Sequence, residues 1–374
     1  MKFLFTCGGT AGHINPALGV AGKIKERLPD AQFLFVGAKG KMETELVPRA
    51  GYEIRTVTIT NLSRSLKPKM ILHNLQTVRN VFASTTEAKR IIREFQPDVA
   101  VGTGGYVCYP VLAAAAGMGI PTAVHESNAV PGLTTRMLAR KVDKIMVGFE
   151  ESRENYKQRS KVLVTGTPVR CEFTAMTREQ AKAALGLPAD LPLVVSVWGS
   201  LGADHMNQIM SELITHMPEN EFSLIHATGK RGYKRFMERL ENAGAANRKN
   251  VDVREYIYNM PVVMEAADLV LCRAGASTLS ELAVLGKPAL LVPSPNVTNN
   301  HQEKNARVLE GAGAARVLLE GQFTAESLLS DMRTLLSDSV ALQAMSRNMS
   351  TQGNIQATDE IAEILIDMAR QHKK

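Results

Sequence analysis

The feature that most constrains this chain is an alternation of short apolar segments with helical patterns, which runs through the sequence twice. The apolar segments predict strands at Lys2–Thr6, Gln32–Val36, Val99–Val101, Thr122–His125, Ile145–Val147, Val162–Thr165, Leu193–Val197, Ser223–His226, Val251–Arg254, Leu269–Leu271, Ala289–Val292 and Ala315–Leu318. Strands that alternate with helices imply right-handed crossovers and a parallel sheet. The sequence therefore predicts an α/β fold of two Rossmann-like, doubly wound sheets whose strand ends face a shared cleft.

The domain boundary is predicted near Gly166-Thr167-Pro168, where the first rhythm ends in turn residues. A length of 374 residues suits two domains of ordinary size. We expect an N-terminal domain at 1–165, a C-terminal domain at 166–350 and a last amphipathic helix within 351–374. Ile361, Leu365 and Met368 share one face of that helix, which we expect to pack back on the N-terminal domain.

Charge is unevenly divided between the two halves. Residues 1–165 hold 23 Lys and Arg against 13 Asp and Glu, a net +10, whereas residues 166–374 hold 21 against 24, a net −3. A basic half attracts anionic membranes or nucleic acid. Because we find no nucleic-acid motif, we favour an anionic membrane surface, with a merely solvated basic face as the alternative.

No run of about 20 apolar residues is long enough to cross a bilayer. The four cysteines are scattered without metal-ligand spacing, and no D-x-D motif for a divalent ion lies between the domains. We therefore expect no metal and no cofactor.

Glycine-rich turns follow several predicted strands, and they are the candidate binding loops. They begin at Gly8, Gly102, Gly199 and Arg273, the last as Arg273-Ala274-Gly275-Ala276-Ser277-Thr278. Such turns let the backbone approach a ligand, and the helix amino terminus that follows favours phosphate. A single glycine turn is common between a strand and a helix. Because the four turns occupy the same position after their strands, a bound ligand is the favoured interpretation. We expect Asn15-Pro16 to cap the helix Pro16–Arg27 after the first turn.

Two titratable residues near these turns are candidate catalysts. His13 sits in the first turn, and neutral imidazole can accept a proton near pH 7. Glu126 ends a predicted strand and is the second candidate, although it can equally anchor its own turn.

Taken together, the motifs of this chain resemble those of the MurG family of GT-B glycosyltransferases. The resemblance runs from residue 1 to about 365 through GGTAGHINPAL (8–18), GTGGYV (102–107), PTAVHESNAVPGLTTRMLAR (121–140), GTPVR (166–170), WGSLGA (198–203), CRAGASTLSELAVLGKPALLVPSP (272–295) and NNHQEKNA (299–306). Members of that family transfer N-acetylglucosamine (GlcNAc) from UDP-GlcNAc to lipid I, which yields lipid II for peptidoglycan.

The resemblance implies a GT-B fold with the acceptor lipid on the N-terminal domain and UDP-GlcNAc mostly on the C-terminal domain. It implies donor contacts at Thr10, Ala11, Gly12, Asn128, Arg170, Ser200, Ile257, Ala276, Ser277, Thr278, Leu279, Ser280, Glu281 and Gln302. Ile257 would read uracil through its backbone, and Glu281 would accept both ribose hydroxyls. Ser277 and Thr278 would take the diphosphate, Gln302 and Asn128 sugar hydroxyls, and Arg170 the charge on the leaving group.

The chain departs from other members of the family at a few positions. Ala11 replaces a glycine, Trp198 stands where glycine is common, and His301 takes the first place of a paired glutamine. These changes leave the reaction class intact. They bear on the detailed shape of the pocket.

The function implied is inverting transfer of GlcNAc to the C4 hydroxyl of MurNAc in lipid I. His13 would act as the base. Partners would be UDP-GlcNAc, lipid I and an anionic membrane, and a complex of wall-building proteins is a further candidate. The protein would lie at the cytoplasmic face of the cell membrane as a peripheral protein.

A lipid-facing segment is predicted within residues 64–82. Ile71, Leu75 and Phe82 fall near one helical face, with Lys67 and Lys69 nearby for anionic headgroups. The alternative is that this stripe is buried in the protein's own core.

Two other functions remain open from the sequence. One is a different GT-B activity, such as a glycolipid synthase or a UDP-GlcNAc 2-epimerase. The other is a non-catalytic nucleotide-sugar-binding subunit, although such a subunit would not need a full set of loops in both halves.

Overall fold

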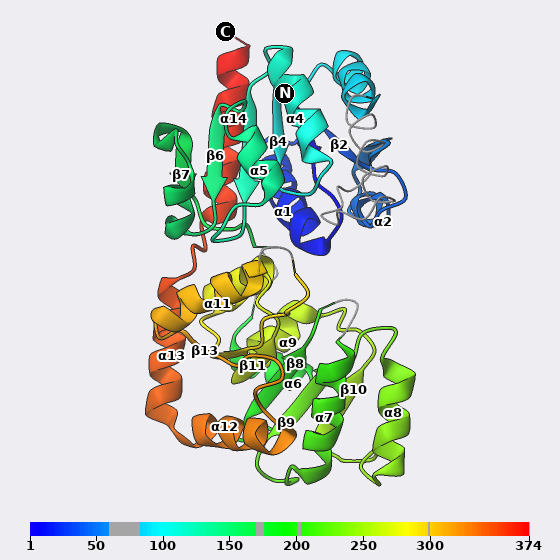
Figure 1. Cartoon of the computed structure of the whole chain (residues 1–374), viewed down its shortest axis with the longest axis vertical. Helices are drawn as coiled ribbons and strands as arrows, with labels where there is room; N and C mark the ends of the chain where they lie inside the picture. The colour runs from blue at the N-terminus through cyan, green and yellow to red at the C-terminus, as the bar shows by residue number, and fades with distance from the viewer. Residues whose placement is uncertain (60–82, 170–175, 200–202, 298–299, 374) are drawn as a thin grey trace, which may run out of the picture. The chain divides into compact units, whose positions relative to one another are not determined.

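The computed structural model of the chain divides into two compact units, Met1–Arg170 with Ile355–Lys374 and Cys171–Asn354 (Figure 1). It describes residues 1–59, 83–169, 176–199, 203–297 and 300–373. The chain thus passes from the first unit to the second near residue 170 and returns near residue 355.

The first unit is built on a parallel sheet of seven strands. Its order across the sheet is β3 (Glu53–Val57), β2 (Gln32–Ala38), β1 (Lys2–Thr6), β4 (Val99–Gly102), β5 (Thr122–Glu126), β6 (Lys144–Val147) and β7 (Val162–Val164). The order runs backward from β3 to β1 and forward from β4 to β7, so the direction of winding reverses between β1 and β4. In doubly wound sheets this switch point is where ligands bind, outside the carboxyl ends of the strands.

The second unit repeats this plan with six parallel strands. Their order is β10 (Val251–Arg254), β9 (Ser223–Ala227), β8 (Leu193–Val197), β11 (Leu269–Cys272), β12 (Ala289–Leu291) and β13 (Ala315–Val317). Its switch point lies between β8 and β11. Both sheets confirm the predicted α/β fold with two doubly wound parallel sheets.

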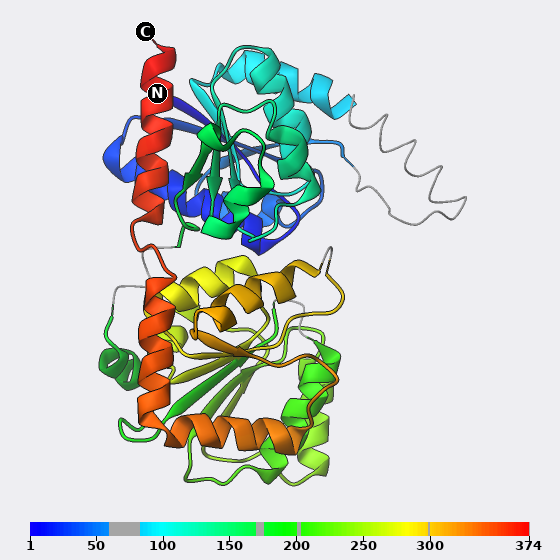
Figure 2. The same cartoon turned by 60° about the vertical axis from the view of Figure 1, so that its left-hand side comes forward.

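Helices follow most strands and cover both faces of each sheet (Figure 2). In the first unit they are α1 (Ala11–Arg27), α2 (Glu43–Arg49), residues 83–95, α4 (Cys108–Gly117), α5 (Leu133–Leu138) and α14 (Ala357–His372). In the second unit they are α6 (Arg178–Ala184), α7 (Asp204–His216), α8 (Tyr233–Asn242), α9 (Met260–Ala266), α10 (Ala276–Leu285), α11 (His301–Gly311), α12 (Ala325–Ser337) and α13 (Ser339–Thr351). No helix in the described ranges is both long and apolar enough to span a bilayer.

Both faces of the first sheet are buried along its central strands, which explains why β1 and β4 are mostly apolar at successive positions. Along β1, Phe3 and Phe5 pack into a cluster with α1 and α14, whereas Leu4 packs into a cluster on the other face with α4. Successive side chains of a strand point to opposite faces, so a fully covered strand needs apolar residues at every position.

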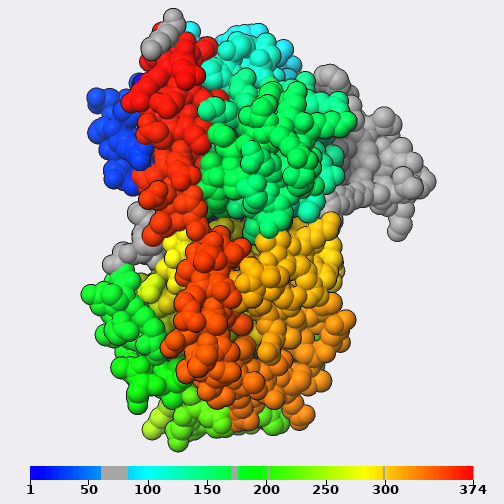
Figure 3. Space-filling model, turned by 90° about the vertical axis from the view of Figure 1, so that its left-hand side faces the viewer, coloured from blue at the N-terminus to red at the C-terminus, as the bar shows by residue number. Residues whose placement is uncertain are grey.

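Helix α14 lies along the surface of the first unit (Figure 3). Ile361, Leu365 and Met368 are buried in the cluster that also holds Phe3 and Phe5. Arg27 at the end of α1 adds ion pairs to Asp359 and Glu363, with nitrogen–oxygen distances of 2.7 and 2.5 Å. The last helix of the chain therefore completes the core of the unit that the first strand begins.

The structure corrects the predicted start of the first helix. We expected Asn15 to cap it, but α1 begins at Ala11 with Thr10 as the N-cap, and Pro16 lies inside the helix. The first turn forms upstream of the proline, because the amides of His13 and Ile14 donate to the carbonyl of Thr10 at 3.0 and 3.3 Å. This shift places His13 on the first turn of the helix.

In the first unit the sequence pattern missed one strand and one α-helix. Strand β3 carries Glu53 and Arg55 at the edge of the sheet, and only Val57 of its side chains is buried. Helix α2 is short and contains Pro48, and a proline argues against a helix when only the local sequence is considered. The second miss matters most, because α2 begins with Glu43.

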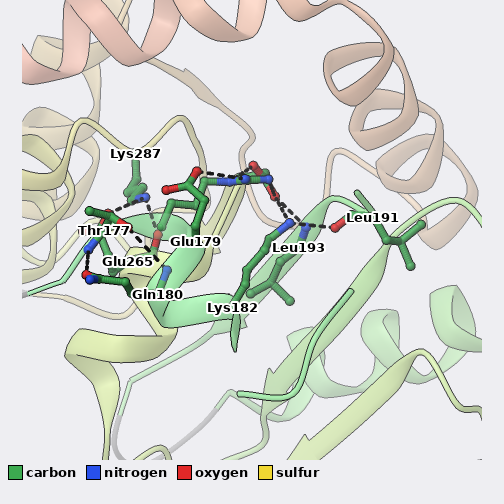
Figure 4. Close-up of polar contacts among 10 residues, drawn as sticks. Thr177, Glu179, Gln180, Lys182, Leu191, Leu193, Glu265 and Lys287 are labelled. Atoms are coloured by element: carbon green, nitrogen blue, oxygen red, sulfur yellow. Dashed lines mark hydrogen bonds and ion pairs between the residues drawn. The ribbon is translucent and has the colours of Figure 1, made fainter. Parts of the chain in front are cut away.

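A half-buried ion-pair network lies at the amino end of the second sheet, the end away from the switch point (Figure 4). Asp268, just before β11, accepts hydrogen bonds from Arg178 at 2.7 and 3.0 Å and from the amide of Leu193 at 2.8 Å. Lys182 lies 3.1 Å away and donates to the carbonyl of Leu191 at 2.7 Å. Burial favours the neutral acid, but these partners outweigh it and hold the pKa of Asp268 below its ordinary value.

Replacing Asp268 with Asn tests this network. The change removes the carboxylate that Arg178 and the almost fully buried Lys182 share, so the second unit should lose about 3 kcal/mol of unfolding free energy at pH 7. Trp198 is the only tryptophan in the sequence and is buried in this unit. Its fluorescence during urea unfolding measures the loss.

The pH dependence gives a second readout for Asp268. Its pKa is depressed in the fold, so its contribution is full above an unfolded-state pKa of about 3.9 and is lost as pH falls through the lower folded value. The Asn variant should lack this acid loss. Asp252→Asn is the control, because Asp252 pairs with Arg254 at an exposed position and should change stability by less than about 1 kcal/mol. Equal losses for the two variants would contradict the network's role.

Candidate functional site

The loops that follow β1 and β4 interlock at the switch point of the first unit. The amide of Gly8 donates to the carbonyl of Gly104 at 3.1 Å, and the hydroxyl of Thr103 donates to the carbonyl of His13 at 2.6 Å. Gly105 has a φ of +94°, and a Cβ there would lie 2.4 Å from the oxygen of Gly8. The close approach of these two loops therefore requires glycine.

The side chain of Glu43 fixes the loop that follows β1. Its fully buried carboxylate accepts hydrogen bonds from the amides of Gly9 at 3.0 Å and Ala38 at 2.9 Å. A Cβ at Gly8 would lie 2.5 Å from a carboxylate oxygen of Glu43. Sequence reasoning missed this residue, since only the folded chain brings Glu43 under a loop 34 residues away.

His13 is placed by the same loops, and its hydrogen bonds define its tautomer. Nδ1 lies 2.9 Å from the carbonyl oxygen of Gly8 and 3.3 Å from the hydroxyl of Thr10. A carbonyl oxygen can only accept, so Nδ1 carries the proton and Nε2 of the neutral ring has a lone pair. The ring is half-buried against Gly104, where a Cβ would lie 2.4 Å from Cδ2 of His13.

The other donor positions expected on this loop lie at the start of α1. Thr10 is exposed, and Ala11 and Gly12 are half-buried. The first turn of α1 contains no acidic residue, and Thr10 makes no side-chain cap. The helix's own first turn therefore supplies no acidic side chain against its positive end, and the nearby carboxylate of Glu43 is engaged by the amides of Gly9 and Ala38.

Glu126 ends β5 and organises the loop that follows it. One carboxylate oxygen accepts from the backbone amide and the side-chain amide of Asn128, at 3.1 and 2.8 Å. The other accepts from the amide of Gly132 at 2.9 Å and the hydroxyl of Thr135 at 2.7 Å. The geometry of this 6% exposed side chain is that of an anchor, the second of the two roles that the sequence left open.

His125 ties the same loop to the chain beyond β7. Its Nε2 donates to the carbonyl of Gly166 at 2.9 Å, and the hydroxyl of Ser127 lies 3.3 Å from Nδ1. Burial lowers the pKa of His125 and keeps the ring neutral. This histidine is therefore a structural link.

The second unit presents the amino terminus of α10 at its own switch point. Gly275 is the N-cap and offers no side-chain cap, and the first turn holds no acidic residue. Ser277, Thr278 and Glu281 are half-buried, whereas Ala276 and Leu279 are buried. The hydroxyl of Ser280 donates to the carbonyl of Ala276 at 3.0 Å. Such an end favours a phosphate group.

Ile257 lies in a loop of the second unit, and Gln302 lies in the first turn of α11. Ile257 is 3% exposed and lies between β10 and α9. The side-chain oxygen of Gln302 accepts from the amide of Ser294 at 2.8 Å, which ties α11 to the loop after β12. Tyr256 and Tyr258 flank Ile257 with their rings edge to face at 4.8 Å, an exposed aromatic pair that sequence reasoning missed.

Arg273 begins one of the predicted binding loops, but sequence reasoning assigned no role to its side chain. Its guanidinium Nη1 donates to the carbonyls of Val292 and Pro293, at 3.1 and 3.3 Å, and to Glu320 at 2.6 Å. It thereby joins the loop before α10 to the ends of neighbouring strands.

Several predicted positions lie outside the described residues. These are the donor contacts Arg170 and Ser200 and the membrane positions Lys67, Lys69, Ile71, Leu75 and Phe82. Within the ranges that the structure describes, no group of three or more His, Cys, Asp and Glu side chains is arranged to hold a metal.

Comparisons with known proteins decide the family. The model of the glycosyltransferase family 28 N-terminal domain matches residues 3–147, and that of the C-terminal domain matches residues 193–362. The chain belongs to glycosyltransferase family 28. It is therefore a glycosyltransferase by family, as the sequence predicted.

Individual relatives in family 28 confirm the resemblance to MurG. The chain is 44% identical over 371 residues to the UDP-N-acetylglucosamine–N-acetylmuramyl-(pentapeptide) pyrophosphoryl-undecaprenol N-acetylglucosamine transferase of Acetivibrio thermocellus, and covers 99% of each chain. A Thermoanaerobacter protein of the same name is 44% identical over 365 residues, with 98% and 99% covered. The crystal structure of MurG from Acinetobacter baumannii matches with a TM-score of 0.75 at 26% identity, with 98% and 99% covered, which confirms the GT-B fold.

Gly104 offers a test of how His13 is placed. Its φ is +123°, and a Cβ would overlap the His13 ring, so Gly104→Ala should displace the imidazole. His13 is the candidate base, and misplacing a reacting group by about 1 Å costs roughly 10²-fold, so with His13 in that role sugar-transfer turnover should fall by about that factor. Gly117→Ala is the control, since no atom lies within 4 Å of its Cβ position. Wild-type turnover in the Gly104 variant would contradict this placement.

Proposed function

We propose that this chain transfers GlcNAc from UDP-GlcNAc to the C4 hydroxyl of MurNAc in lipid I, with inversion, and releases lipid II and UDP. The reaction is a step of peptidoglycan precursor synthesis. The observation that carries the proposal is the 44% identity, over 99% of both chains, to a relative whose name describes this transfer. The two switch points supply the groups that each half of the reaction needs.

The donor is proposed to bind at the carboxyl edge of the second sheet. The amides at the start of α10, from Ala276 to Thr278, would receive the diphosphate, with the hydroxyls of Ser277 and Thr278. Glu281 would accept the ribose hydroxyls, and the backbone at Ile257 would read the uracil edge. Gln302 would bond sugar hydroxyls from α11. The rest of the proposed set is Thr10, Ala11, Gly12, Asn128, Arg170, Ser200, Leu279 and Ser280.

His13 is proposed as the base. The C4 hydroxyl oxygen forms a bond to the anomeric carbon while the bond from that carbon to the phosphate oxygen breaks. The hydroxyl proton passes to Nε2 of His13, and UDP leaves with the electron pair. The tautomer supports this role, because the bond from Nδ1 to the carbonyl of Gly8 leaves the Nε2 lone pair as the acceptor.

Glu126 then acts as a positioning residue on the acceptor side. Four hydrogen bonds already engage its two oxygens, and accepting a proton would weaken them. Its task is to shape the loop that presents Asn128.

One assay tests the reaction against its rivals. Radiolabelled UDP-GlcNAc is incubated with and without a lipid I analogue, and the labelled lipid and the free sugar are separated. The proposal expects labelled lipid only when the acceptor is present. An epimerase would give altered or free sugar without acceptor, and a glycolipid synthase would label a different lipid. A binding subunit would give no product at all.

In the same assay, His13→Ala should lower turnover by roughly 10²- to 10⁴-fold, because the base is lost. His13→Gln should be as slow, since an amide can donate to Gly8 but cannot accept the proton. UDP affinity by calorimetry should stay near wild type in both. His216→Ala, at an exposed position on α7, is the control. Turnover near wild type in either His13 variant would remove His13 from this role.

We also propose that the first unit docks on the cytoplasmic face of an anionic membrane. Leu133 and Met137 of α5 are 46% and 44% exposed and lie one turn apart on the same helix face. Arg136 and Arg140 are exposed beside them. Apolar residues flanked by cations suit a headgroup layer, and α5 begins directly after Gly132, which Glu126 anchors. Residues 1–165 carry a net charge of +10, which is also attracted to an anionic membrane.

Cosedimentation with phosphatidylglycerol vesicles tests the docking surface. The pair Leu133→Ser and Met137→Ser should weaken binding several-fold, and Arg136→Gln about five-fold, since one cation contributes about 1 kcal/mol. The predicted segment supplies a second pair, Ile71→Ser and Phe82→Ser. Val340→Ser is the control, because Val340 is 74% exposed on the other unit. Binding that ignores both pairs would count against the docking proposal.

A further inference from the structure

Trp198 occupies the switch point of the second unit directly after β8. It is 3% exposed and belongs to the apolar cluster that also contains Met206 and Met210 of α7. Across the face of its indole ring lies the guanidinium of Arg273, with 5.7 Å from Cζ to the ring centroid. The contact joins the ends of β8 and β11, the two strands between which the winding reverses (Figure 1).

Arg273 transmits this contact to the other strands of the sheet. Its side chain is 13% exposed and bonds to the carbonyls after β12 and to Glu320, which follows β13. Glu320 lies 3.1 Å from Nδ1 of His205 at the start of α7. The guanidinium of Arg273 therefore connects the segments that follow β12 and β13 to the end of β11. The indole ring of Trp198 packs against the face of this guanidinium.

The position of Arg273 links this arrangement to the donor. Arg273 comes directly after β11, and only Ala274 and Gly275 separate it from the first turn of α10. Gly275 makes no side-chain cap, so the neighbouring backbone, and not a cap, must orient the first amides of the helix. Fixing Arg273 therefore fixes the direction in which those amides point.

We propose that Trp198 is a positioning residue for the diphosphate of the donor, and that it acts by holding Arg273 through the face of its ring. The inference rests on the proposed function, because it assigns the α10 amides to that diphosphate. The cation–π contact thus lies two residues before the N-cap of α10, at the residue that leads into the proposed phosphate-binding turn.

The ring face, and not the indole N–H, carries the effect. The N–H of Trp198 is buried and has no hydrogen-bond partner among the described residues, which makes it a destabilising feature by itself. A phenylalanine keeps an aromatic face and removes that unpaired donor. A leucine keeps apolar bulk and removes the face.

Calorimetric titration with UDP, together with thermal unfolding, separates positioning from core packing. Trp198→Leu should weaken UDP binding by roughly 5- to 30-fold, whereas Trp198→Phe should stay within about three-fold of wild type. Phe222→Leu is the matched control, because Phe222 is buried in the same cluster as Trp198. It lies just before β9, at the amino ends of the strands, whereas Trp198 lies at the carboxyl ends. The control substitution should lower the unfolding temperature and leave UDP affinity unchanged.

A double-mutant cycle with Arg273→Met supplies a readout that packing alone would not move. If Trp198 acts through Arg273, Trp198→Leu should add little further loss of UDP affinity once Arg273 is gone. Independent, additive losses would overturn the inference, as would wild-type UDP affinity in Trp198→Leu. An equally weak Trp198→Phe variant would also overturn it.

The same measurements keep this inference distinct from the proposed function. A wild-type chain that binds no UDP would overturn both. A chain that binds UDP but makes no labelled lipid would contradict the proposed reaction, and the Trp198 effect on UDP affinity would still decide the inference.

Discussion

In both units the direction of winding reverses between two neighbouring strands, and the candidate site depends on that reversal. Between β1 and β4, and again between β8 and β11, the following loops depart to opposite faces of the sheet. At these points two glycine-rich loops can meet edge to edge, as Gly8 and Gly104 do. The rest of the fold covers the sheets and holds those loops in place.

Charged side chains inside each unit hold these loops, each through two or more hydrogen bonds. Glu43 accepts two amides under the first loop, and Glu126 accepts four hydrogen bonds from the loop after β5. Arg273 plays the corresponding part in the second unit. A buried charge destabilises a protein unless its partners satisfy it. The hydrogen bonds of each group therefore stabilise one conformation of its loop relative to the alternatives.

The two edges differ in the chemistry that they offer. The first unit presents an imidazole whose tautomer is set by a backbone carbonyl, which suits proton transfer. The second presents the uncapped amino end of α10 with hydroxyls on its first turn, which suits an anionic diphosphate. An inverting transferase needs both a base for the acceptor hydroxyl and groups that stabilise the negative charge on the leaving group.

The sequence by itself determined the strands, the doubly wound class and the loops that matter, because those follow from local periodicity and from glycine after each strand. It also brought out His13 and the set of motifs shared with MurG. It missed β3, whose polar residues suit an edge, and it began α1 at Pro16, where the helix in fact starts at Ala11.

Only the tertiary structure decided what the polar residues do. Glu43 reaches Gly9 across 34 residues, and Arg273 meets Trp198 although the two are far apart in the chain. The role of Glu126, a base or an anchor on sequence grounds, depended on four donors that a one-dimensional pattern does not place. Periodicity is a property of neighbours in the chain, whereas hydrogen bonds and ring contacts at a switch point join residues that only the folded sheet brings together.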